Sequence, residues 1–118
     1  MSDLDQVRRF ALALPGATEE PHFDMTSFRV RGKIFATVPP GDEYLHVFVD
    51  EGEINAAVAE DPAACEPLLW GNRVRGLRVR IAAASDDRVA ELLEESWHRK
   101  APARLAAEWE RSGRGTAG

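Results

Sequence analysis

The sequence predicts an α+β two-layer sandwich, in which N- and C-terminal helices pack on one face of an antiparallel sheet. Helical signals lie at both ends of the chain and strand signals dominate between them, an order typical of this class. Residues 28–34 and 73–81 alternate apolar and basic side chains, the period of a strand with one face in the core. With 118 residues, the chain is long enough for one domain with a real core.

The alternation also predicts which face of the sheet is covered. The apolar members of the two segments should point toward the helices, and the arginines between them toward water. The expected core side is formed by Phe28, Val30, Leu77, Val79 and Ile81.

The first half of the chain predicts one helix and three strands. Ser2, with Asp5 at the capping-box position, should start a helix over residues 3–14, and Pro15-Gly16 should end it. A short strand is expected at residues 18–23. Residues 28–30 and 33–38 should form a hairpin that turns at Arg31-Gly32.

Loop composition at residues 39–42 precedes a strand rich in β-branched and aromatic residues at 44–49. Asp50 should cap a short helix that runs to about residue 60, and Asp61-Pro62 can start a single further turn.

The second half predicts another hairpin and the closing helices. Residues 68–70 and the Arg-rich strand to Ile81 should pair across a Gly71-Asn72 turn. Ser85 should cap a helix over residues 86–100, with a helical extension from Pro102 through Trp109. We therefore expect a single domain at residues 1–110 and a disordered tail at 111–118.

Charge is segregated along a chain whose net charge is −5. Between Ile34 and Asn72 there is no Lys or Arg, and the acids there are Asp42, Glu43, Asp50, Glu51, Glu53, Glu60, Asp61 and Glu66. The acidic total argues against non-specific coating of DNA or of an anionic membrane, although a local basic patch is still compatible with binding.

A single cysteine, Cys65, excludes an internal disulfide and a thiolate zinc site from this chain alone. There is no signal-peptide pattern and no apolar run of membrane-spanning length. These features indicate a bacterial-type cytoplasmic protein, and we expect no cofactor and no membrane partner.

The main functional clue is a set of basic residues on the two predicted hairpins. Nucleic-acid phosphates are the ligand this pattern favours, because lysine and arginine side chains neutralise them without reading sequence. The alternative is that these side chains are solvated or paired with neighbouring acids. The candidate residues are Arg29, Arg31, Lys33, Arg73, Arg75, Arg78 and Arg80.

Metal binding and catalysis find less support in the sequence. Asp50, Glu51, Glu53 and Glu60 are candidate oxygen ligands, but their spacing does not focus them on one point. The histidines are scattered at His22, His46 and His98, and Cys65 has no histidine at a recognisable spacing. We expect no enzymatic activity and no tightly bound metal.

The aromatic residues have two readings. Trp70, Trp97 and Trp109 are expected to be core anchors rather than a stacking platform. Tyr44, His46 and Phe48 share the polar side of a strand beside the arginines, where they can stack bases or be covered by a loop or a partner. We favour cover or self-association.

Several segments together resemble the MmcQ/YjbR-like family. They are Leu12–Phe23, Ser27–Ala36, Trp70-Gly71, the strand end Val79-Arg80-Ile81, and Ala101–Leu105. The likeness spans about residues 4–105. It implies a frataxin-like (CyaY-like) fold and a DNA-binding protein whose two β-hairpins act as wings. A non-enzymatic protein-interaction or metal-handling module is the alternative that this shape implies.

One segment departs from the family pattern. Phe23-Asp24-Met25-Thr26 stands where the family often has a tryptophan followed by Gly-Lys-Pro. One basic residue is missing there and an acid stands nearby, which counts against DNA binding by this chain.

Overall fold

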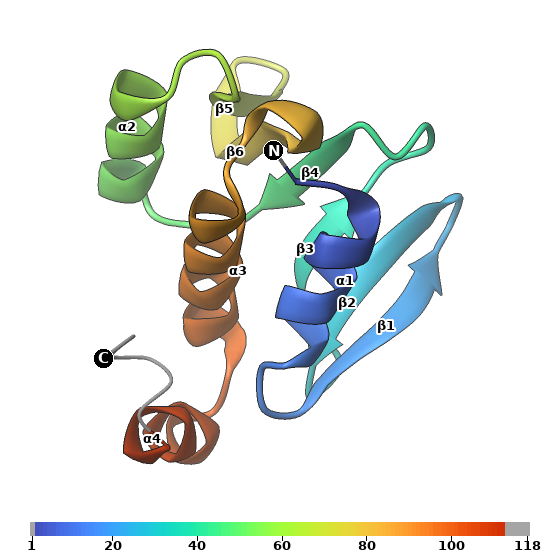
Figure 1. The fold of residues 1–118 in the computed structure, drawn as a ribbon, viewed down its shortest axis with the longest axis vertical. Coiled ribbons are helices and arrows are strands. Elements are labelled where there is room, and N and C mark those ends of the chain that lie inside the picture. The colour runs from blue at the N-terminus through green and yellow to red at the C-terminus, as the bar shows by residue number, and fades with distance from the viewer. Residues whose placement is uncertain (1, 113–118) are drawn as a thin grey trace.

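Six antiparallel strands form one open sheet with helices in front of one face (Figure 1). The computed structural model describes residues 2–112. The elements are α1 (Leu4–Leu12), β1 (Ala17–His22), β2 (Met25–Val30), β3 (Lys33–Val38), β4 (Tyr44–Val47), α2 (Glu51–Glu60), β5 (Cys65–Trp70), β6 (Arg73–Arg80), the 3-10 turn η1 (Ile81–Ala83), α3 (Asp86–Lys100) and α4 (Ala103–Arg111). The strand order is β1-β2-β3-β4-β6-β5. The predicted α+β sandwich is confirmed.

Side chains at the helix starts explain where the helices begin. Asp50 and Ser85 cap α2 and α3 as predicted, each accepting a hydrogen bond from a backbone N–H in the first turn. The predicted cap of α1 is wrong: Asp3, not Ser2, accepts the hydrogen bond from the Gln6 backbone N–H, at 2.9 Å. Asp3 has the extended backbone of a cap residue, so the helix starts one residue later than a Ser2 cap requires.

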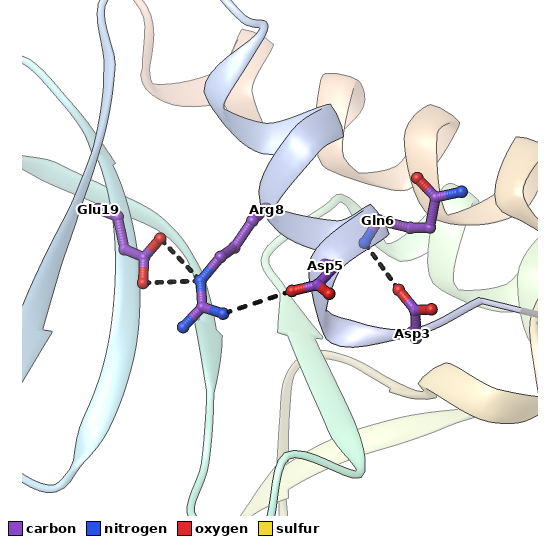
Figure 2. A network of polar contacts seen from close by, with 5 residues as sticks. All are labelled: Asp3, Asp5, Gln6, Arg8 and Glu19. Carbon is purple, nitrogen blue, oxygen red and sulfur yellow. Dashed lines mark hydrogen bonds and ion pairs between the residues drawn. The ribbon is translucent and has the colours of Figure 1, made fainter.

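A polar network ties α1 to the edge of the sheet (Figure 2). Arg8 on α1 reaches both carboxylate oxygens of Glu19 on β1, at 3.1 Å each, and lies 3.9 Å from Asp5. Its charge is therefore neutralised within the fold.

The core lies between the helices and the sheet, as the alternation predicts. The five residues of the expected core side are at most 2% exposed: Phe28, Val30, Leu77, Val79 and Ile81. Trp97 on α3 is fully buried and donates its indole N–H to the Pro15 carbonyl at 3.0 Å. Trp109 packs edge-on against it, with ring centroids 6.2 Å apart. These two tryptophans are core anchors, as expected.

β4 ends at Val47, two residues earlier than predicted, because a side chain of α3 binds the backbone beyond it. The Ser96 hydroxyl accepts a hydrogen bond from the Phe48 backbone N–H at 2.9 Å and donates one to the Phe35 carbonyl. A buried serine on a helix thus bridges two strands at the point where their own ladder stops.

The early end of β4 leaves two hairpins projecting from the same end of the sheet. β3 and β6 flank β4, and Val47 pairs with Ala36 on one side and with Leu77 on the other. The strand segments beyond these pairs lead to the β2–β3 turn and to the β5–β6 turn. Gly76 sits at the start of the β6 projection, where an added Cβ would lie 2.5 Å from the Val47 carbonyl oxygen, so only glycine allows this close approach.

β1 and β5 are the edges of the sheet, and each carries a proline. Pro21 lies in β1 and Pro67 in β5, and acids precede both residues in the same strands. Neither proline has a backbone N–H to offer to a further strand.

The C-terminal helix reaches Arg111, the first residue of the segment expected to be a tail. The remainder of that expectation falls on residues 113–118, which lie outside the described residues. Within residues 2–112, no helix has both the length and the apolar character needed to cross a membrane.

Candidate nucleic-acid interface

The structure divides the seven predicted basic residues by what holds them. Arg29 on β2 is partly buried, and its guanidinium donates to the Ser27 hydroxyl at 3.1 Å and to the Pro21 carbonyl at 3.4 Å. These contacts fix Arg29 along the outer side of the β1–β2 hairpin. It acts as a structural residue there, with less freedom to meet a phosphate.

Arg78 on β6 is held by three neighbours on the outer face of the sheet. Its guanidinium carbon lies 3.8 Å from the centroid of the Tyr44 ring, and its Nε is 3.6 Å from the Glu66 carboxylate. His46 is its direct cross-strand partner. The alternative reading of solvated or paired arginines therefore describes Arg78, which has both an aromatic and an acidic partner.

Tyr44 and Arg80 form the next pair along the same two strands. Arg80 is exposed, with its guanidinium 5.9 Å from the Tyr44 ring centroid and one nitrogen 3.4 Å from the Tyr44 hydroxyl. Two arginines of β6 thus lie over Tyr44, whereas cover by a loop or a partner stays a prediction.

His46 lies between Thr37 and Arg78 in the same row of the sheet. Its Nε2 is buried, and no residue among 2–112 gives it a hydrogen bond. Burial lowers the pKa of His46 below its ordinary value of 6.5, and the positive charge of Arg78 lowers it further. The imidazole is therefore neutral at pH 7.

Two of the four candidate oxygen ligands, Asp50 and Glu60, have structural partners. Asp50 caps α2, and Glu60 binds Arg88 at 2.9 Å. Burial raises the pKa of Glu53, with Glu95 adding to the effect. Within the described chain, no three His, Cys, Asp or Glu side chains gather to hold a metal ion.

The remaining residues considered for catalysis lie on different elements of the fold. His22 packs edge-on against Phe23 at the end of β1, and His98 against Trp97 on α3. Burial raises the pKa of the Cys65 thiol, which makes the reactive thiolate scarce at neutral pH. The absence of catalysis stays a prediction.

Arg31, Lys33, Arg73 and Arg75 lie on the two projecting hairpins and are exposed. Within residues 2–112, none of the four forms an ion pair with a carboxylate. The fold therefore places these four charges at one end of the sheet, and their role in binding stays a prediction.

The interpretation of Trp70 as a core residue is wrong. Trp70 is 59% exposed at the end of β5, and its hairpin neighbour Val74 is 52% exposed. The guanidinium of Arg75 lies over the indole, 5.0 Å from the ring centroid. The β5–β6 hairpin extends past the end of β4, so its tip has no neighbouring strand on the β4 side among residues 2–112. The buried residues Phe28 and Val79 lie in strand segments with a neighbour on both sides. The signal in the sequence is position: Trp70 directly precedes the Gly71-Asn72 turn, which puts it at a hairpin tip.

An open groove of about 1020 Å³ lies beside this hairpin, and sequence reasoning missed it. Its lining combines apolar and aromatic side chains of the sheet with charged groups from three elements. The residues most relevant here are Phe48, Leu68, Trp70, Arg73, Val74, Arg75, Arg99, Lys100, Asp50 and Glu51.

Two of the groove's positive charges come from the end of α3. Arg99 donates to the Phe48 carbonyl at 3.2 Å, and Lys100 follows it. From the sequence alone, these residues are recognised only as positive charges that are favourable at a helix C-terminus. The available signal was the unbroken run His98-Arg99-Lys100, whose place beside the hairpin depends on the tertiary fold.

Together, the fold and the site define a small α+β protein with an open sheet face and two basic hairpins at one end. The YjbR family model matches residues 12–99, so the chain belongs to the YjbR family. The predicted resemblance is confirmed at this level.

The solved structures include a relative in fold. The crystal structure of a Deinococcus radiodurans protein with a DUF419 domain superposes with a TM-score of 0.70. The match covers 82% of this chain and 77% of that one at 20% identity, a level that bears on the fold alone. Comparison with curated proteins gives no match.

Proposed function

We propose that this protein binds nucleic acid through the tips of its β2–β3 and β5–β6 hairpins. The observation that carries the proposal is the set of four exposed basic residues without acidic partners in the described chain, Arg31, Lys33, Arg73 and Arg75, at one end of the sheet. Such side chains neutralise phosphates and release counterions, which is the main source of sequence-independent affinity. A cytoplasmic location suits such a ligand.

The charges predict a modest, salt-sensitive interaction. Arg99 and Lys100 lie close enough to line the same groove as the β5–β6 hairpin, but the chain as a whole carries a net charge of −5. Binding should therefore be detectable at low salt and weak at physiological salt, because the overall charge repels the polyanion.

The test is a salt titration of binding to mixed-sequence duplex DNA. Replacing Arg73 and Arg75 together by Gln should make the log–log salt slope shallower by about 2, since each neutralised phosphate contributes roughly −0.9. The matched control is Arg9→Gln with Arg104→Gln, two exposed arginines on α1 and α4 whose loss changes the net charge equally. Equal slopes for the two double variants, or no binding by the parent at low salt, contradict the proposal.

A second candidate function is a non-enzymatic protein-interaction module. The exposed apolar residues Leu69, Trp70 and Val74 at the β5–β6 hairpin favour it, because such clusters mark contact surfaces. Binding of a protein partner through apolar residues would be nearly insensitive to salt. Binding of nucleic acid would weaken as salt rises, so the salt dependence of binding separates the two functions.

A further inference from the structure

We infer that the nucleic acid this site takes is single-stranded, with a base stacked on the indole of Trp70. This inference rests on the proposed function and adds the class of nucleic acid. Its origin is the groove beside the β5–β6 hairpin, where aromatic and basic side chains lie together.

Trp70 is the first line of support. Its indole is 59% exposed, and Arg75 lies over the ring at 5.0 Å. This arrangement places a positive charge next to an aromatic surface that solvent reaches. Bases of a single strand stack on such rings whatever their sequence, and the charge meets the neighbouring phosphate.

The apolar part of the groove is the second line of support. Phe48, Leu68 and Val74 line it together with Trp70. A duplex keeps the faces of its bases stacked inside and presents phosphates outward, so it leaves these side chains uncovered. A single strand presents bases and phosphates together, and therefore complements both the apolar and the basic parts of the lining.

The mixed charge of the groove is the third line of support. Arg73, Arg75 and the end of α3 supply positive charge, whereas Asp50 and Glu51 line the same groove. One row of phosphates can follow the basic side chains. The second row of a duplex has no matching basic surface there and would meet the acids, which favours the single strand.

The experiment compares three probes of equal length at low salt: an oligothymidylate, an abasic strand with the same phosphates, and a duplex. The parent should prefer the oligothymidylate to both others. Trp70→Ala should weaken oligothymidylate binding by roughly 5- to 150-fold and leave the abasic strand unchanged, while Trp70→Phe should retain most of the affinity. Leu12→Ala is the control, because Leu12 is an apolar residue 44% exposed on α1, outside the groove lining, and should have no effect.

Fluorescence gives an independent readout. Trp97 and Trp109 are buried, so quenching of the accessible indole emission by the oligothymidylate reports Trp70 and should vanish in Trp70→Ala. Equal affinity of the parent for thymidylate and abasic strands, or tighter binding of the duplex, overturns the single-strand inference while the phosphate contacts of the proposed function stand. Failure of all three probes to bind at low salt contradicts the proposed function itself, and with it this inference.

Discussion

His46 shows how strongly the sheet environment changes a single residue. It sits in a row of polar side chains that crosses the outer face, with Thr37 on one side and Arg78 on the other. Its Nε2 is shielded from water, so the imidazole carries the cost of burial without a hydrogen bond from the described chain. The neutral form is the one the fold tolerates.

This environment predicts a pH dependence of stability. Because the folded pKa of His46 lies below 6.5, the unfolded chain takes up a proton first as the pH falls. The free energy of unfolding should therefore decrease from about pH 6.5 down to the lower folded pKa and then level off for this group. Urea denaturation of the parent and of His46→Gln across this range measures the difference, with His22→Gln as the control.

The variant His46→Gln should lose this part of the pH dependence, whereas His22→Gln should keep it. A parent whose stability is unchanged between pH 7 and the acid range contradicts the assignment.

At the scale of residues, the sequence predicts burial well inside strands and poorly at their ends. Alternation placed Phe28 and Val79 correctly because each strand there has neighbours on both sides. Trp70 is a large apolar residue as well, but it lies at a hairpin tip and is 59% exposed. Hydrophobicity alone does not separate a core tryptophan from an exposed one.

At the scale of elements, the turn of the β2–β3 hairpin holds Gly32, which adopts a positive φ easily, next to Arg31, which does not. Arg31 and Gly32 form its turn, with φ of +53° and +79° respectively. Both central residues of a type I′ turn need positive φ, a conformation that costs an ordinary side chain about 1 kcal/mol. Arg31 therefore carries strain at one of the positions that the proposed function uses.

Replacing Arg31 by Asn should separate the two effects. Asparagine favours this turn position, so Arg31→Asn should raise the free energy of unfolding by about 0.5–1 kcal/mol. The same change should make the salt slope of duplex binding shallower by about 0.9, because one phosphate contact is lost.

Arg31→Gln is the control for this hairpin, since it removes the charge and keeps an ordinary side chain. It should reproduce the change in slope without the gain in stability measured by denaturation. A gain of equal size in both variants would assign the effect to charge instead of turn geometry.

Two helix starts and the β2–β3 turn were predictable because local signals determine them, whereas the start of α1 was placed one residue too early. The caps at Asp50 and Ser85 and the Arg31-Gly32 turn were all recognised from a few neighbouring residues. The end of β4 was not, because Ser96, far along the chain on α3, takes the Phe48 N–H. A contact between segments that are far apart in the sequence has no signal in the residues around either one.

At the scale of the whole molecule, the element order predicted the layers but not the strand order. β4 pairs with β6, and β5 becomes an edge after α2. Only this arrangement brings the end of α3 beside the β5–β6 hairpin and forms the groove. The basic hairpin residues could be predicted from the sequence, whereas the roles of Trp70, Arg99 and Lys100 depend on tertiary structure.

The two edge prolines have a consequence for how the protein behaves at high concentration. An open sheet ends in unpaired backbone groups that can template the strand of another copy and so start aggregation. Pro21 and Pro67 interrupt the donors along both borders, and the preceding Glu20 and Glu66 add like charges that repel a second copy.

Pro67→Thr should therefore increase light scattering in concentrated solutions over time, while Pro40→Thr, in a loop, should not. Indistinguishable scattering from the two variants would contradict this role of Pro67. The sheet leaves one face open, and its proline-bearing borders discourage the pairing between copies that would build fibres. Without the edge prolines, the open sheet would favour aggregation at high protein concentration.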